Sequence, residues 1–199
     1  TAGDPLAAFE VAARFADGRG VPQDLAAALD WYRRSAETGL APAQYRLGSL
    51  YEKGTGTARD AKTAAEWYTK AATLGNAKAM HNLAVLNAEG GLGEPNYQVA
   101  ARLFQQAADF GVRDSQFNLG ILFARGLGVP RDLASSYKWF AIAANGGDGD
   151  SAKKRDDIAQ VLSKEDLARA RLAVETWQAK PLDPAANAVA INPAWTAAP

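Results

Sequence analysis

The sequence predicts an all-α fold of stacked helix hairpins, and three observations support this prediction. Four segments of 36 residues align with one another without a gap: 5–40, 41–76, 77–112 and 113–148. Alanine, the residue with the highest helix propensity, accounts for 44 of the 199 residues, and 18 glycines punctuate the chain. Apolar residues make up 48% of the sequence, which is enough for a packed core. Repeats of this length are typical of arrays in which each repeat packs on its neighbours.

Each repeat is expected to begin with a helix that buries positions 7, 8 and 11 of the repeat. In the second repeat these positions hold Leu47, Gly48 and Tyr51, which share one helix face. Position 8 is small in every repeat, so that a second helix can approach closely. Glycine at position 14 is expected to end this helix, because the residue that follows a helix commonly has positive φ. These glycines are Gly18, Gly54, Gly90 and Gly126.

A second helix is expected to begin after position 20, where an Asp or Asn side chain can accept hydrogen bonds from the first free N–H groups. The capping residues are Asp24, Asp60, Asn96 and Asp132. Position 28 of this helix is always aromatic and position 32 is always alanine, which predicts tight packing against the first helix. Glycine at position 35 turns the chain into the next repeat.

The third repeat departs from the others in the loop between its helices. Leu92 stands where the other repeats have glycine, and Asn87 and Leu103 replace aromatic residues. We expect this loop to follow a different path and this hairpin to be the least stable of the four.

The remaining chain is predicted to close the array. Residues 1–148 hold the four repeats, residues 149–178 are expected to form a divergent fifth helix pair that caps them, and residues 179–199 are a Pro/Ala-rich extended tail. The tail is either a flexible linker or an extended strap on the repeats, and Val189, Ile191 and Trp195 are apolar enough to dock.

Composition excludes most catalytic chemistry. The 22 basic and 22 acidic residues balance, which disfavours binding to nucleic acid or anionic lipid through net charge. The absence of Cys removes thiolate sites, and a single His, His81, removes multi-His metal sites. Residues 145–150 are interpreted as a helix-ending turn rather than a calcium loop. We therefore predict no catalytic residues, no cofactor and no metal.

The second repeat, residues 41–76, resembles the Sel1-like repeat, with the pattern A-x-x-x-L-G-x-x-Y-x-x-G-x-G-x-x-x-D-x-x-x-A-x-x-W-Y-x-x-A-A-x-x-G. Sel1-like repeats are related to tetratricopeptide repeats and have a longer loop between the helices. The resemblance implies a right-handed α-solenoid that acts as a protein-interaction scaffold, with other proteins or peptides as partners. Some Sel1-like proteins are linked to β-lactam hydrolysis, but those resemble cysteine-rich versions, from which this chain differs.

Residues 79–97 and 111–159 resemble the periplasmic part of the alphaproteobacterial polar organelle development (PodJ) family. This resemblance implies a scaffold on the periplasmic side of the inner membrane at a cell pole, anchored by a segment outside this chain. A soluble periplasmic regulator of a sensor kinase is an alternative, and the composition is compatible with a cytoplasmic location as well.

The first helices of tetratricopeptide-like arrays line a concave surface, which here becomes the candidate partner-binding site. Positions 5, 6 and 9 of the repeat lie away from its buried face. They place rings beside amide and guanidinium donors, which suit an extended peptide, and Arg46 can hold a carboxylate. The candidate residues are Tyr45, Arg46, Ser49, His81, Asn82, Val85, Phe117, Asn118 and Ile121.

Two alternatives to this peptide-binding surface remain open. The position 5 rings, with His81 as one more flat ring, are alternatively buried between hairpins, and His81 is alternatively a pH-sensitive contact. The surface is alternatively a peptidoglycan-binding groove in which the rings stack on sugars.

Overall fold

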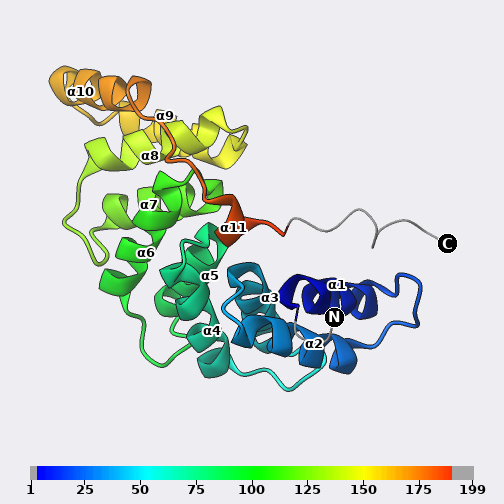
Figure 1. Ribbon diagram of the computed structural model, residues 1–199. Helices are drawn as coiled ribbons and strands as arrows, with labels where there is room; N and C mark the ends of the chain where they lie inside the picture. Colours follow the sequence, from blue (N-terminus) through cyan, green and yellow to red (C-terminus); the bar gives the residue numbers. More distant parts are fainter. Residues whose placement is uncertain (1–3, 190–199) are drawn as a thin grey trace. The chain divides into compact units, whose positions relative to one another are not determined.

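A computed structural model describes residues 4–189, and all regular secondary structure in this range is helical (Figure 1). This confirms the predicted all-α fold of the α-solenoid class. The helices are α1 (Pro5–Asp17), α2 (Leu25–Glu37), α3 (Ala41–Lys53), α4 (Ala61–Thr73), α5 (Ala77–Ala88), α6 (Tyr97–Asp109), α7 (Arg113–Arg125), α8 (Leu133–Asn145), α9 (Gly149–Ala159), α10 (Lys164–Glu175) and α11 (Pro184–Asn187). Within residues 4–189, no helix is both long and apolar enough to cross a membrane.

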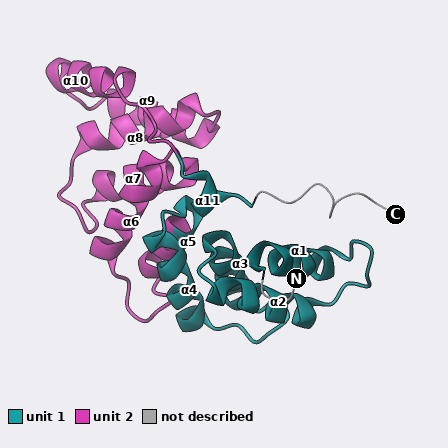
Figure 2. Cartoon of the chain, viewed as in Figure 1, with its two compact units in different colours: residues 1–79, 182–199 teal, residues 80–181 magenta. Residues whose placement is uncertain are grey.

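The described chain divides into two compact units (Figure 2). Unit 1 comprises residues 4–79 together with 182–189, and unit 2 comprises residues 80–181. The boundary falls inside α5, in the third repeat. The C-terminal segment therefore returns to the unit that contains the first repeats.

Both units build their hairpins from the same capping contacts. In unit 1 the Asp60 carboxylate accepts hydrogen bonds from the N–H groups of Lys62 and Thr63, and in unit 2 Asp132 accepts from Ala134 and Ser135. These bonds satisfy donors that the helix itself leaves free. The predicted position 20 caps are confirmed.

In the second and fourth repeats, the loop between the helices lies directly against the start of the second helix of the preceding repeat. A Cβ added to Gly56 would lie 2.3 Å from the carbonyl oxygen of Leu25, and one added to Gly128 would lie 2.1 Å from that of Tyr97. Both glycines also have positive φ. No residue with a side chain fits this site, so the position 16 glycine fixes how neighbouring repeats stack.

The loop of the third repeat follows a different path, as predicted. The glycines at position 16 of the other repeats have φ between 69° and 74°, whereas Leu92 does not have positive φ and Gly93 takes it instead, at 128°. The loop still closes with a hydrogen bond from the Asn96 N–H to the Asn87 carbonyl oxygen, at 2.8 Å. The lower stability of this hairpin stays a prediction.

Rings at position 5 pack on rings at position 28 in every repeat. The centroids are 5.3–5.9 Å apart in the pairs Phe9–Tyr32, Tyr45–Tyr68, His81–Phe104 and Phe117–Phe140. The interpretation of His81 as one more flat ring is confirmed. Its Nδ1 also lies 2.8 Å from the hydroxyl of the buried Ser115.

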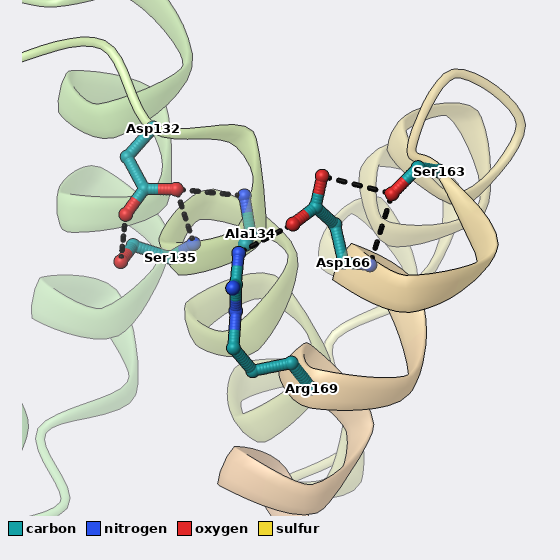
Figure 3. Close-up of polar contacts among 6 residues, drawn as sticks. All are labelled: Asp132, Ala134, Ser135, Ser163, Asp166 and Arg169. Atoms are coloured by element: carbon teal, nitrogen blue, oxygen red, sulfur yellow. Dashed lines mark hydrogen bonds and ion pairs between the residues drawn. The ribbon is translucent and has the colours of Figure 1, made fainter.

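The segment expected to form a fifth helix pair forms α9 and α10, and α10 packs on α8 through the buried Ala170. The Ser163 hydroxyl accepts a hydrogen bond from the Asp166 N–H, and Asp166 pairs with Arg169 (Figure 3). Partial burial opposes ionisation of Asp132, but hydrogen bonds from Ser135 and the charge of Arg169 together lower its pKa. The helix pair is thus held to the last repeat by apolar packing around Tyr137, Phe140 and Ala170.

Residues 182–189, here called the strap, lie against unit 1. The helical turn α11 packs on α3, and the Val189 side chain packs on the core cluster that contains Phe9 and Leu47. The sequence left two interpretations of the tail open, a flexible linker and a strap on the repeats. The described part of the tail is docked on the repeats. Ile191 and Trp195 lie outside the described residues.

Candidate functional site

Each unit carries a pocket on the surface of its first helices, formed by equivalent repeat positions. Both pockets use positions 2, 5, 6 and 36 of one repeat. Each pocket also uses position 2 of the segment that follows this repeat. The pocket of unit 1 encloses about 230 Å³ and is lined by Phe9, Pro42, Tyr45, Arg46, Asn76, Lys78, Asn187, Ala188 and Val189. The pocket of unit 2 encloses about 480 Å³ and is lined by Arg113, Asp114, Phe117, Asn118, Gly147, Asp148 and Asp150.

The pocket of unit 1 has an aromatic wall and a cationic rim. Phe9 is buried and Tyr45 is half-buried, with its ring 5.9 Å from that of Tyr68. Burial raises the pKa of Tyr45, and the charge of Arg46 only partly offsets this, so the phenol stays neutral at neutral pH. Arg46 and Lys78 are exposed, and no ion pair joins either of them to another described residue.

The deep end of this pocket is a polar junction between the repeats and the strap. Asn76 is only 2% exposed, and its Oδ1 accepts a hydrogen bond from the Ala79 N–H at 2.8 Å. Its Nδ2 donates to the carbonyl oxygen of Ala186 at 2.6 Å. One buried side chain therefore caps α5 and binds the backbone of the strap.

The pocket of unit 2 has the same aromatic wall but acidic surroundings. The Phe117 ring packs 5.6 Å from that of Phe140, and the Lys154 ammonium lies 5.9 Å from the Phe117 centroid. Asp148 caps α9 by accepting a hydrogen bond from the Asp150 N–H. Within residues 145–150, which the sequence predicted to hold a helix-ending turn, residues 146–148 form the turn from α8 to α9. No strap residue lines this pocket.

The Arg113 side chain secures the turn beside this pocket. Its guanidinium donates to the Gly146 carbonyl oxygen at 2.6 Å. Arg113 brings one positive charge to the lining, whereas Asp114, Asp148 and Asp150 bring three carboxylates. The unit 2 pocket has an excess of negative charge.

The structure gathers four of the nine candidate residues into pockets. Tyr45 and Arg46 meet in unit 1, and Phe117 and Asn118 meet in unit 2. The other five are half-buried on α3, α5 and α7 and line neither pocket; they are Ser49, His81, Asn82, Val85 and Ile121. Of the four position 5 rings, Tyr45, His81 and Phe117 are half-buried and Phe9 is buried. Each ring packs on the position 28 ring of its own repeat.

Sequence reasoning named no candidate residue at positions 36 and 2, and it did not connect the expected strap with this pocket. Position 36 is apolar in two repeats, as Leu40 and Val112, and polar in the other two, as Asn76 and Asp148, so this alternation is a signal that was available. Lys78 and Asp150 share position 2 with opposite charge. Asn187 carries no signal in the sequence, because its role depends on the path that folds the tail back onto α3.

The four repeats match a known family. Residues 5–40, 41–76, 77–111 and 113–148, well over half of the chain, match the Sel1 repeat. The chain belongs to the Sel1 repeat family. Proteins of this family generally act as non-catalytic scaffolds that bind other proteins. No curated protein sequence matches the chain.

Several solved structures are similar to it, among them two crystal structures. A Sel1 repeat protein from Oxalobacter formigenes is 33% identical, with a TM-score of 0.71 over 78% of this chain and 45% of that one. A protective antigen from uropathogenic Escherichia coli strains, which displays an SLR fold, is 27% identical, with a TM-score of 0.52 over 88% of this chain and 45% of that one. The chain thus spans less than half the length of either structure.

Proposed function

We propose that this chain is a non-catalytic protein-interaction scaffold that binds peptide segments on its first helices. One observation carries the proposal: in unit 1 a peptide segment, the strap, already lies on this face, with backbone and side-chain hydrogen bonds to the repeats. A surface that holds one short peptide segment through main-chain and side-chain hydrogen bonds beside a pocket with an aromatic wall suits other segments of the same kind.

The test uses peptides selected on the full chain from a random phage-displayed library. Replacing Arg46, Asn82 and Asn118 together by Ala is expected to abolish their binding. A matched control replaces Lys62, Gln98 and Gln106, which are exposed on second helices and likewise supply one cation and two amides. Circular dichroism checks that both variants fold. Undiminished binding by the folded inner-face variant would contradict the proposal.

We further propose that the scaffold acts on the periplasmic side of the inner membrane at a cell pole, anchored through a segment outside this chain. The support is the resemblance of residues 79–97 and 111–159 to the periplasmic part of the PodJ family. Fluorescence microscopy of the whole protein, with and without this region, tests the position, and protease access in spheroplasts tests the compartment. A uniform periplasmic signal would favour the soluble regulator of a sensor kinase instead.

Peptidoglycan is a second candidate ligand, favoured by the unit 2 pocket. A ring flanked by carboxylate and amide groups is a chemistry that binds sugars, and Phe117 there has Asn118 and Asp114 beside it. Cosedimentation with insoluble peptidoglycan is the measurement. Retention that Phe117→Ala and Tyr45→Ala both abolish would support this candidate, and no retention would remove it.

A further inference from the structure

The strap is bound to unit 1 as a peptide ligand is bound, through specific contacts along its length. The Asn187 side chain accepts a hydrogen bond from the Ala77 N–H at 2.9 Å and donates to the Gly75 carbonyl oxygen at 3.1 Å. Ala186 is 3% exposed, and its methyl carbon lies 3.8 Å from where a Cβ of Gly75 would stand. The turn between the two repeats therefore accepts a small side chain at Ala186 and forms hydrogen bonds with the side chain of Asn187.

The preceding part of the chain contacts unit 2 at the equivalent turn. The Lys180 N–H donates to the Asp109 carbonyl oxygen at 2.8 Å, and its ammonium lies 2.9 Å from the Asp109 carboxylate. The methyl of Ala179 stands 3.4 Å from where a Cβ of Gly111 would be. Gly111 and Gly75 are both position 35 glycines, so a small residue beside a polar one meets the inter-repeat turn in each unit.

The charge of the unit 1 pocket is left unmatched by the strap. Ala188 lines the pocket together with Arg46 and Lys78, and its side chain is exposed. Residues 184–189 carry no charge, and residues 190–199 contain no Asp or Glu. The nearest acid in the strap, Asp183, caps α11 by accepting from the Ala185 N–H. Two cations thus face a strap position that offers only a methyl group.

We propose that this groove of unit 1 binds, in exchange for the strap, a peptide that keeps the helical turn with the Ala-Asn pair of residues 186–187 and carries an acidic side chain in place of Ala188. The added carboxylate pairs with Arg46 and Lys78 across the pocket. The strap is then a weak intramolecular occupant that a better matched partner displaces. This inference rests on the proposed function, and it specifies the partner's chemistry at one site.

The experiment uses the full chain and three fluorescein-labelled peptides. One peptide reproduces residues 182–189, and the other two carry A188D or A188K. A strap-weakened protein, N187A with V189S, leaves the groove intact because both substitutions lie in the strap. Hydrogen exchange of residues 182–189 reports whether the strap is released in this variant, and fluorescence polarisation measures peptide binding.

We expect the strap-weakened protein to bind the native peptide more tightly than the wild type does, because its groove is vacant for more of the time. We expect the A188D peptide to bind about fivefold more tightly than the native one, with the advantage lost at high salt. The A188K peptide should bind more weakly than either, and R46E in the protein should invert the order of A188D and A188K.

Three results would overturn the inference: a strap that stays protected in the weakened variant, equal binding of the native peptide to both proteins, or no preference for A188D. These results leave the proposed function standing if library-selected peptides still depend on Arg46, Asn82 and Asn118. If those peptides also lose this dependence, the proposed function fails as well.

Discussion

The two pockets are built from the same repeat positions and differ in charge and in cover. In unit 1, Arg46 and Lys78 make the pocket cationic, and the strap forms one wall. In unit 2, Asp114, Asp148 and Asp150 make it acidic, and no strap residue lines it. The aromatic wall has two rings in unit 1, Phe9 and Tyr45, and one in unit 2, Phe117, and each of them packs on a position 28 ring. The scaffold therefore fixes where a pocket forms, and the variable positions fix what it attracts.

This difference explains how a chain with balanced charge can still select partners. The 22 basic and 22 acidic residues cancel over the whole chain, but they do not cancel within each pocket. Local excess charge next to an aromatic wall favours ligands by pairing at short range rather than by long-range steering. Two pockets of opposite sign on one chain suit segments of different charge.

The largest expected effect concerns the scaffold that both pockets share. Gly128→Ala places a Cβ against the Tyr97 carbonyl oxygen and also strains a positive φ, so we expect it to lower the free energy of unfolding by roughly 3 kcal/mol. Gly56→Ala should do the same in unit 1. Gly20→Ala is the matched control, because Gly20 has positive φ but no atom within 4 Å of the added Cβ.

Urea unfolding followed by circular dichroism measures these changes. The control should cost about 1 kcal/mol, the strain of the backbone alone. A loss no larger at Gly128 than at Gly20 would show that the loop contact does not set the stacking of repeats, and the shared scaffold would lose its main support.

The next effect separates the units through the strap. Asn187→Ala removes hydrogen bonds to Ala77 and Gly75 and leaves their partners in part-buried positions, so we expect the docked strap to lose roughly 1.5 kcal/mol. Hydrogen exchange should speed up at residues 182–189 and at the start of α5. The start of α9, capped by Asp148, serves as the internal control. Equal acceleration at both helix starts would mean that the substitution acts on the whole chain.

A smaller effect tests the charge difference directly. Lys78 and Asp150 hold the same repeat position, so K78D and D150K reverse one charge in each pocket. We expect K78D to reduce the binding of the A188D peptide by about threefold, in proportion to one exposed ion pair. D150K should leave that binding unchanged, since its pocket lies in the other unit. Equal effects of K78D and D150K on the binding of the A188D peptide would contradict the proposed charge difference between the two pockets.

The smallest effect concerns pH. A hydrogen bond from the Thr63 hydroxyl lowers the pKa of Asp60, and the hydroxyl of Ser135 helps to lower that of Asp132 against the opposing effect of burial. Because the folded pKa lies below the usual value of 3.8 at both sites, the stabilisation is complete above that pH and is lost as the pH falls through the folded value.

T63V and S135A should therefore raise the two pKa values and flatten the acid limb of the stability curve. Carbon-13 NMR titration of the carboxyls and urea unfolding between pH 2 and 6 check this. Unchanged pKa values in both variants would show that the hydroxyls do not stabilise the ionised carboxylates that cap these helices.

The sequence predicts the scaffold well because each structural role recurs at the same position of every repeat. The caps at Asp60 and Asp132 and the ring of His81 each occupy a column whose physical role is the same in every repeat. Leu92 stands at the repeat position where the other three repeats have glycine, and this difference predicts the altered loop for the same reason. Local spacing carries these features, so no tertiary information is needed.

The pockets are predicted only in part, because they depend on contacts between distant segments. Tyr45 and Arg46 follow from helix geometry, but Asn187 reaches the pocket through a chain reversal that no spacing encodes. Ser49 and Ile121 share the predicted helix face and still fall outside the pockets. The pockets lie toward position 36 of the same repeat and position 2 of the segment that follows it.

The measurement that tests the central claim most directly is hydrogen exchange of the full wild-type chain on addition of the A188D peptide. The account predicts faster exchange at residues 182–189 and slower exchange at the backbone of Tyr45 and Arg46, because the added peptide replaces the strap on α3. Slower exchange at the strap together with unchanged exchange at α3, or no change at either, would contradict it.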